Sequence, residues 1–161
     1  MARSKLVLLV ALATTALATF AAGAAAAPVH VTPVSGGYLV TAFGETTCAP
    51  LAGDRLDCRT TGLEATYEGS LVGRSTARFA QLIDCAAGRT VGHGTETFTG
   101  SLGTRTGTLT WSLAFTSDFD CATFIPSNLR IVAVVTQGTG ALLGSRGVLV
   151  FDDTAYRGLL R

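Results

Sequence analysis

Apolar and polar side chains alternate along much of the chain after Pro28. The clearest alternation runs over residues 108–115, and one side of it carries four large apolar residues: Leu109, Trp111, Leu113 and Phe115. Successive side chains of a strand point to opposite faces, so this pattern predicts a strand with one buried face. No sustained helical spacing of apolar residues follows Pro28. The pattern therefore predicts an all-β domain.

Further strands are predicted wherever the same alternation, or a short apolar run, recurs. They fall at residues 38–42, 63–67, 77–83, 131–135 and 148–151, with a short last one at 156–160. The chain has 19 glycines, mostly between these runs, which suits tight turns. Seven or eight strands with short turns predict a barrel or a sandwich. The longest irregular stretches are expected at Thr46–Arg59 and Ser117–Asn128.

The first 26 residues have a different composition. Arg3 and Lys5 precede an uncharged stretch, residues 6–27, that ends in the small residues Ala24-Ala25-Ala26. This order is typical of a secretory signal peptide, here cleaved after Ala26. An uncleaved membrane anchor is the alternative, but the alanine-rich stretch and its small-residue end favour cleavage. The sequence predicts a secreted protein in which residues 27–161 form one domain and have no membrane partner.

All four cysteines lie in residues 27–161: Cys48, Cys58, Cys85 and Cys121. An even number of cysteines in an exported chain favours two disulfides, and four cysteines allow three pairings. We favour Cys48–Cys58, which would bracket a turn-forming segment, together with Cys85–Cys121. A zinc site is the competing interpretation. The sequence has no C-x-x-C spacing and only two histidines that could bind zinc, so no metal is predicted.

Charge and motifs exclude several classes of function. Cleavage would remove Arg3 and Lys5 from the 12 basic residues and leave them nearly balanced by 11 acidic ones. No basic stripe is present, so a nucleic-acid partner is not expected. There is no G-x-S-x-G nucleophile motif and no glycine-rich phosphate loop followed by a helix, so neither a catalytic triad nor a cofactor is predicted.

One short motif occurs three times. Segments 67–75, 98–107 and 138–147 each contain Gly-x-Leu, then Gly, then Arg, between two strand-like runs. The spacing between the copies is not constant, which argues against a solenoid. We interpret the motif as one kind of hairpin used three times, with its leucine packed under the end of the barrel.

These three hairpins resemble those of the DUF3224 family of uncharacterised bacterial proteins. The middle copy matches the family's E-x-F-x-G-x-x-G-x-x-G segment at Glu96, Phe98 and the three glycines that follow. The last copy matches its closing G-T-G-x-L-x-G-x-x-G segment, and the resemblance covers about Glu64 to Val150. Members of this family look like the allene oxide cyclase and dirigent barrels. The resemblance therefore implies a single antiparallel barrel of about eight strands.

The chain also departs from the family pattern. The first hairpin has Ser70 where the family usually has an acidic residue. The predicted signal peptide, the four cysteines and the extra Thr46–Arg59 segment suggest an exported branch. The barrel architecture by itself implies no reaction.

Three residues are candidates for chemistry: Glu96, Glu64 and His93. Glu96 belongs to the family motif, and a carboxylate inside an apolar barrel could act as an acid or base. The alternative is a rim glutamate bonded to an arginine. His93 lies three residues before Glu96 on one predicted strand, so the two point to opposite faces. We expect His93 to be structural or solvated, and the catalytic residues remain unknown.

Two functions follow from this pattern. The first is a non-enzymatic exported barrel that binds a small apolar molecule, or acts as an interaction module, because barrels of eight strands are just wide enough for a small ligand. Candidates for lining the cavity are Tyr67, Phe79, Leu109, Trp111, Leu113 and Phe115. The alternative is an isomerase or cyclase of the allene oxide cyclase type, which would need Glu96 or Glu64 to point inward. Oligomer assembly through a barrel face is a third option.

Overall fold

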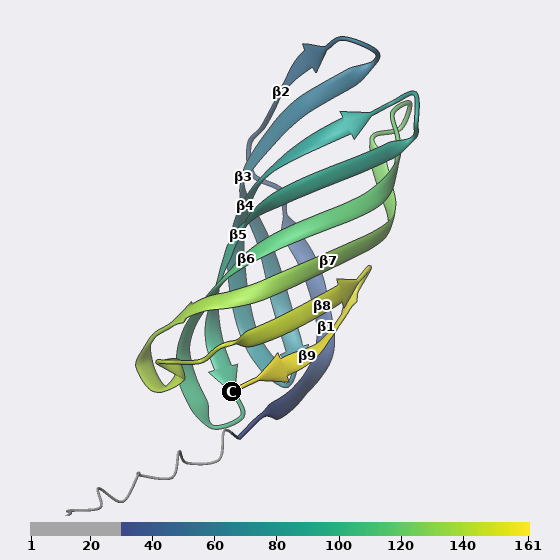
Figure 1. Cartoon of the computed structure of the whole chain (residues 1–161). Helices are drawn as coiled ribbons and strands as arrows, with labels where there is room; N and C mark the ends of the chain where they lie inside the picture. Colours follow the sequence, from purple (N-terminus) through teal and green to yellow (C-terminus); the bar gives the residue numbers. More distant parts are fainter. Residues whose placement is uncertain (1–29) are drawn as a thin grey trace, which may run out of the picture.

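A single antiparallel sheet of nine strands closes on itself in the computed structural model, which describes residues 30–161 (Figure 1). The predicted signal peptide, residues 1–26, lies outside the described residues. The strands are β1 (Thr32–Ala42), β2 (Thr46–Leu51), β3 (Arg55–Gly69), β4 (Leu71–Asp84), β5 (Arg89–Leu102), β6 (Arg105–Asp120), β7 (Ile125–Gly138), β8 (Gly147–Asp152) and β9 (Ala155–Leu160). Residues 30–161 contain no helix with the length and apolar character needed to cross a bilayer.

The ring consists of eight strands. Each of β3 to β9 pairs with its neighbours in chain order, and β1 closes the ring by pairing with both β9 and β3. The ninth strand, β2, pairs with the first part of β3 alone and lies outside the ring. The predicted all-β barrel of about eight strands is confirmed. The short strand expected at residues 156–160 is the element that β1 needs for closure.

The strands have unequal lengths. Strands β3 to β7 have 14 to 16 residues, whereas β1 has 11 and β8 and β9 have six each. Beyond the ends of the short strands, the long strands continue as a curved sheet, which extends past β8 and β9 in Figure 1. The ring is therefore complete over only part of its length and open on one side at the other end.

The expectation of irregular structure at Thr46–Arg59 and Ser117–Asn128 was wrong. Both stretches form hairpins of paired strands, with Cys48 opposite Cys58 in one and Phe119 opposite Pro126 in the other. Polar and turn-forming residues mask the alternation in these stretches, although Ser117 and Phe119 are buried and Asp118 and Asp120 are exposed. The neighbouring strand nevertheless satisfies the backbone N–H and C=O groups, and this pairing decides the structure.

Two apolar cores fill the inner face of the sheet. The main core contains Phe98, Leu109 and Trp111, all with an exposed fraction of 0%. A smaller second core lies under the extended strands and contains Cys58, Ile83 and Phe119.

The motif that occurs three times closes the main-core end of the barrel. Leu71, Leu102 and Leu142, one from each copy, are all buried in the main core. In the first two copies the leucine adjoins a hairpin turn, and Gly103 supplies the left-handed conformation (φ 59°) that the β5–β6 turn requires. In the third copy Leu142 belongs to a short 3-10 helix, η1 (Gly140–Leu142). The expected packing of the leucines under the barrel end is confirmed.

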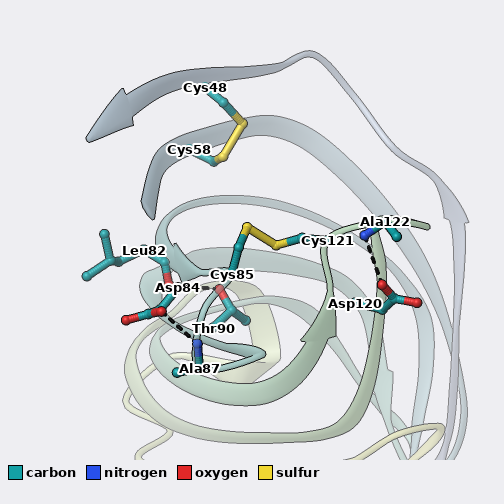
Figure 2. The surroundings of a disulfide bond; sticks show 10 residues. All are labelled: Cys48, Cys58, Leu82, Asp84, Cys85, Ala87, Thr90, Asp120, Cys121 and Ala122. Carbon is teal, nitrogen blue, oxygen red and sulfur yellow. Dashed lines mark hydrogen bonds between the residues drawn. A yellow bond between two sulfur atoms is a disulfide. The ribbon is translucent and has the colours of Figure 1, made fainter. Parts of the chain in front are cut away.

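Both predicted disulfides are present, and residues 30–161 contain no free cysteine. Cys48–Cys58 joins β2 to β3, whereas Cys85–Cys121 joins the β4–β5 turn to the end of β6 (Figure 2). Cys58 belongs to the second core, and Cys85 and Cys121 pack against it. The disulfides therefore reinforce the end of the molecule where the ring is incomplete.

Candidate ligand-binding cavity

A cavity of about 160 Å³ separates the two cores. Along the inner face of β6, Trp111 belongs to the main core, Leu113, Phe115 and Ser117 border the cavity, and Phe119 belongs to the second core. The same order holds on β4, where the cavity-lining residues precede Ile83. Each core therefore forms one boundary of the cavity.

Two glycines on the inner face of β5 make room for aromatic side chains. A Cβ atom at Gly92 would lie 2.2 Å from the Phe115 ring, and one at Gly94 would lie 2.6 Å from Cβ of Phe79. Without these Cβ atoms, both rings lie close to the β5 backbone and meet edge to face, with centroids 5.4 Å apart. The glycines thus place two aromatic rings beside the cavity.

Most of the lining is apolar. Six aromatic side chains border the cavity: Tyr38, Phe43, Tyr67, Phe79, Phe115 and Phe151. Among the lining residues Phe43 is 72% exposed, and Pro126 is exposed as well. Phe43 directly follows β1, and Pro126 is the second residue of β7. These two residues mark the side on which the cavity opens to solvent.

Glu96 is the charged residue that borders the cavity, and it is 7% exposed. Its Oε1 accepts hydrogen bonds from the Tyr67 hydroxyl (2.6 Å) and the Ser75 hydroxyl (2.5 Å). Its Oε2 accepts one from the Trp111 indole N–H (3.0 Å). The carboxylate is thus held by three donors from β3, β4 and β6, none of which carries a charge.

The strand pairing explains why these groups meet. Glu96 lies directly between Ala77 on β4 and Trp111 on β6. The small Ala77 leaves space above the carboxylate, and Ser75 lies two residues earlier on the same face of β4. Burial of a carboxylate costs free energy, and the three hydrogen bonds offset part of that cost. The expectation that Glu96 could instead be a rim residue bonded to an arginine was wrong.

Two buried hydroxyls next to the cavity are unsatisfied. Neither Tyr38 Oη nor Ser117 Oγ has a hydrogen-bond partner among residues 30–161, although both are shielded from solvent. Both residues border the cavity. An unsatisfied buried hydroxyl is costly, so these two groups are available to a polar atom of a bound molecule.

Burial and the negative charge of Glu96 raise the pKa of two tyrosines. For Tyr67 the largest cause is burial, followed by the charge of Glu96 and the hydrogen bond to it. For Tyr38 burial and then the charges of Glu96, Asp153 and Asp152 raise the pKa to about 12. Both phenols therefore remain protonated, and able to donate a hydrogen bond, at neutral pH.

These shifts predict a loss of stability in alkali. The Tyr38 phenol ionises near pH 10 in the unfolded chain but only near pH 12 in the folded one, so the free energy of unfolding should fall between these values. Tyr67 contributes in the same direction. Denaturant unfolding of the wild type and of Tyr38→Phe across this range measures the effect. The Tyr38→Phe variant should show the shallower fall, and equal slopes would contradict the burial of the Tyr38 phenol.

The structure separates the candidate lining residues into two groups. Tyr67, Phe79, Leu113 and Phe115 border the cavity, whereas Leu109 and Trp111 are fully buried in the main core and do not. Trp111 still contributes to the site through its N–H group, which binds Glu96.

The three candidates for chemistry lie on two different faces of the sheet. Glu96 points inward, as described above, whereas Glu64 and His93 are exposed on the outer face. His93 and Glu96 therefore do point to opposite faces, as their spacing predicts. Within residues 30–161, no group of three or more His, Cys, Asp or Glu side chains is placed to hold a metal ion.

Sequence reasoning missed several residues of this site, among them the aromatic Phe43 and Phe151 and the hydroxyl-bearing Tyr38, Ser75 and Ser117. One signal was available for Ser75, because it lies two residues before Ala77 and must share its inward face. Glu96 likewise lies two residues before the apolar Phe98. No sequence signal marked the hydroxyls of Tyr38 and Ser117 as unsatisfied, because that depends on which side chains the closed ring brings near them.

Comparison with known proteins identifies the family. A search of curated protein sequences gives no match. The crystal structure of a protein of unknown function from the DUF3224 family of Shewanella oneidensis MR-1 has a similar fold. The two share 19% sequence identity and a TM-score of 0.60, over 82% of this chain and 98% of the other. The family described as "Protein of unknown function (DUF3224)" matches residues 34–157. The chain therefore belongs to the DUF3224 family.

Proposed function

We propose that the protein binds a small, largely apolar molecule in the cavity between its two cores. A cavity of about 160 Å³ has the size of one that holds a benzene ring, and it opens to solvent beside Phe43 and Pro126. The lining provides aromatic surface for the body of the ligand and a few polar groups to orient it, which is the usual composition of a small-molecule site.

The unsatisfied hydroxyl of Tyr38 is the observation that carries this proposal. Buried hydroxyls in native proteins nearly always have a partner, and those that lack one call for an explanation. Tyr156 provides the contrast within the same barrel. Its hydroxyl accepts a hydrogen bond from the Leu71 N–H (2.7 Å) and donates one to the Glu68 carbonyl (3.1 Å), and it does not border the cavity. A bound polar atom would supply to Tyr38 what the protein supplies to Tyr156.

This contrast predicts opposite effects of two matched substitutions. Tyr38→Phe should leave the free energy of unfolding unchanged or slightly raised, and it should weaken the binding of benzyl alcohol about fivefold, the equivalent of one hydrogen bond. Tyr156→Phe should lower the free energy of unfolding by about 1–3 kcal/mol, because it leaves the buried Leu71 N–H without a partner, and it should leave binding unchanged. Denaturant unfolding and isothermal titration calorimetry measure the two quantities.

Three results would contradict the proposal. They are a Tyr38→Phe variant as destabilised as Tyr156→Phe, equal affinity for benzyl alcohol in wild type and Tyr38→Phe, and no binding of benzyl alcohol by the wild type. The first would mean that the Tyr38 hydroxyl has a structural partner.

A second candidate is an isomerase of the allene oxide cyclase type, and the inward position of Glu96 favours it. Such an isomerase would need a carboxylate inside the barrel, and Glu96 is the carboxylate that borders the cavity. As a base, Glu96 would take a proton from a carbon next to a carbonyl group. The C–H electron pair would form the C=C bond of an enolate, and the Tyr38 hydroxyl would donate a hydrogen bond to its oxygen.

Hydrogen exchange tests this candidate without knowledge of the natural substrate. Acetophenone in D₂O should exchange its methyl hydrogens faster with the wild type than with Glu96→Gln, as followed by mass spectrometry. Equal rates would exclude Glu96 as a carbon base.

The proposed site of action is outside the cytoplasm. Two disulfides are compatible with an exported protein, since such bonds persist in oxidising compartments. The signal peptide predicts that secreted protein begins at Ala27. Expression of the full chain in a bacterial host, followed by mass spectrometry of the protein outside the cytoplasm, measures that end. A mature protein that retained residues 1–26 would contradict the prediction.

A further inference from the structure

The negative charge of Glu96 has no cationic partner in the cavity. All three donors to its carboxylate are neutral, and within residues 30–161 no lysine, arginine or histidine borders the cavity. The structure therefore places a single negative charge beside a small apolar space.

The arginines that pair with Asp152 do not compensate for this charge. Arg130 and Arg157 pair with Asp152 at 3.5 and 3.0 Å, and both arginine side chains are about two thirds exposed or more. They bind Asp152 at the surface, and neither arginine lines the cavity. The charge of Glu96 reaches the inner phenols, where burial is the largest cause of the raised pKa of Tyr67 and Tyr38 and the charge of Glu96 adds to it.

The Glu96 carboxylate also retains room for one more donor. Its Oε1 already accepts two hydrogen bonds, whereas Oε2 accepts one, from Trp111. A carboxylate oxygen can accept two, so Oε2 has one free position. Since Glu96 borders the cavity, a donor group on a bound molecule could fill that position.

The aromatic side chains that line the cavity also favour a positively charged ligand. Tyr38, Phe79, Phe115 and Phe151 surround the same space. The face of an aromatic ring carries partial negative charge and attracts a cation, an effect that strengthens when water is excluded. A carboxylate and several rings around one cavity are complementary to a positively charged nitrogen that carries an apolar group.

We propose that the ligand of this cavity is a small organic cation, an amine whose ammonium group binds Glu96 and whose apolar body contacts the aromatic lining. This inference rests on the proposed binding function and specifies its ligand class. The Tyr38 and Ser117 hydroxyls can accept hydrogen bonds from the remaining ammonium N–H groups. An anionic ligand such as a carboxylate is disfavoured, because it would bring a second negative charge next to Glu96.

Three probes of nearly the same shape test this proposal: benzylamine, benzyl alcohol and benzoate, which are positive, neutral and negative at pH 7. Isothermal titration of the full wild-type protein should show benzylamine binding about tenfold or more tightly than benzyl alcohol, and benzoate most weakly. In Glu96→Gln, which preserves the size of the side chain, amine and alcohol should bind with similar affinity. Glu64→Gln removes an exposed charge from the outer face of β3 and should retain the wild-type order.

The outcomes distinguish this inference from the proposed function. Binding of benzyl alcohol with no tighter binding of benzylamine would overturn the cation preference and leave apolar-ligand binding intact. An amine preference that persisted in Glu96→Gln would overturn the role of Glu96. Absence of binding by all three probes would overturn both the inference and the proposed function.

Discussion

Replacing Trp111 with alanine is expected to lower the free energy of unfolding by about 3–5 kcal/mol, which is typical of a fully buried large side chain. The Trp111 ring has an exposed fraction of 0% and stacks on Phe98 with centroids 6.2 Å apart. The substitution would open a cavity in the main core. It would also remove one of the three donors that hold the Glu96 carboxylate. Equilibrium denaturant unfolding measures the loss.

Trp111→Phe is the matched control, because it retains a ring in the core and removes the indole N–H. Its expected loss is about 1–3 kcal/mol, the cost of leaving one buried polar group without its partner. Similar losses in both variants would mean that the hydrogen bond to Glu96, rather than packing, dominates the contribution of Trp111. A Trp111→Ala variant as stable as the wild type would contradict the tight packing of the main core.

Removal of the Cys85–Cys121 disulfide is expected to cost about 3.8 kcal/mol by the loop-entropy relation. This bond closes a segment with a sequence separation of 36 and ties the β4–β5 turn to the end of β6. Without it, the second core and the adjoining boundary of the cavity lose a covalent link between the extended strands. The double substitution Cys85→Ser/Cys121→Ser, compared with the wild type by denaturant unfolding under oxidising conditions, tests this expectation.

The other disulfide provides the comparison. Cys48–Cys58 spans a sequence separation of only 10, and the same relation gives about 2.7 kcal/mol for its removal. The double variant Cys48→Ser/Cys58→Ser should therefore unfold at a denaturant concentration between those of the wild type and the Cys85/Cys121 variant. The reverse order would show that the β2–β3 link matters more than the link between the two long hairpins.

The fold was predictable from the sequence where one face of a strand is buried. Alternation over residues 108–115 indicated that Trp111 points inward, and three similar hairpins indicated where the barrel ends. The pairing of Cys85 with Cys121 was preferred among three alternatives, and the structure confirms it. The first two predictions depend on local side-chain periodicity and turn-forming residues, whereas the Cys85–Cys121 pairing followed from assigning Cys48 and Cys58 to each other across a turn.

The incomplete ring was not predictable in the same way. Residues 46–59 and 117–128 carry turn-forming and polar side chains, and local pattern alone indicates loops there. Their strand structure arises from backbone pairing with a neighbour, which the side-chain pattern does not record. The two-core arrangement follows from the same extension of the long strands, so the pattern did not indicate it either.

The candidate site was predictable only in part. Glu96 was a candidate because of its motif, but the sequence left a rim position open for it. Burial follows from its position between Ala77 and Trp111 in the closed sheet, a relation between three strands. The unsatisfied hydroxyls of Tyr38 and Ser117 depend on even more distant segments, because their surroundings are set by ring closure.

The proposed binding of a small molecule depends most on a cavity with mainly apolar walls between the two cores, and a crystal structure of the protein under xenon pressure tests that cavity most directly. Apolar cavities of this size take up xenon. The account predicts a xenon atom in contact with Phe79, Leu113 and Phe115, near Glu96, with the surrounding side chains in place. A structure in which these side chains fill the space, so that no xenon binds, would contradict the account.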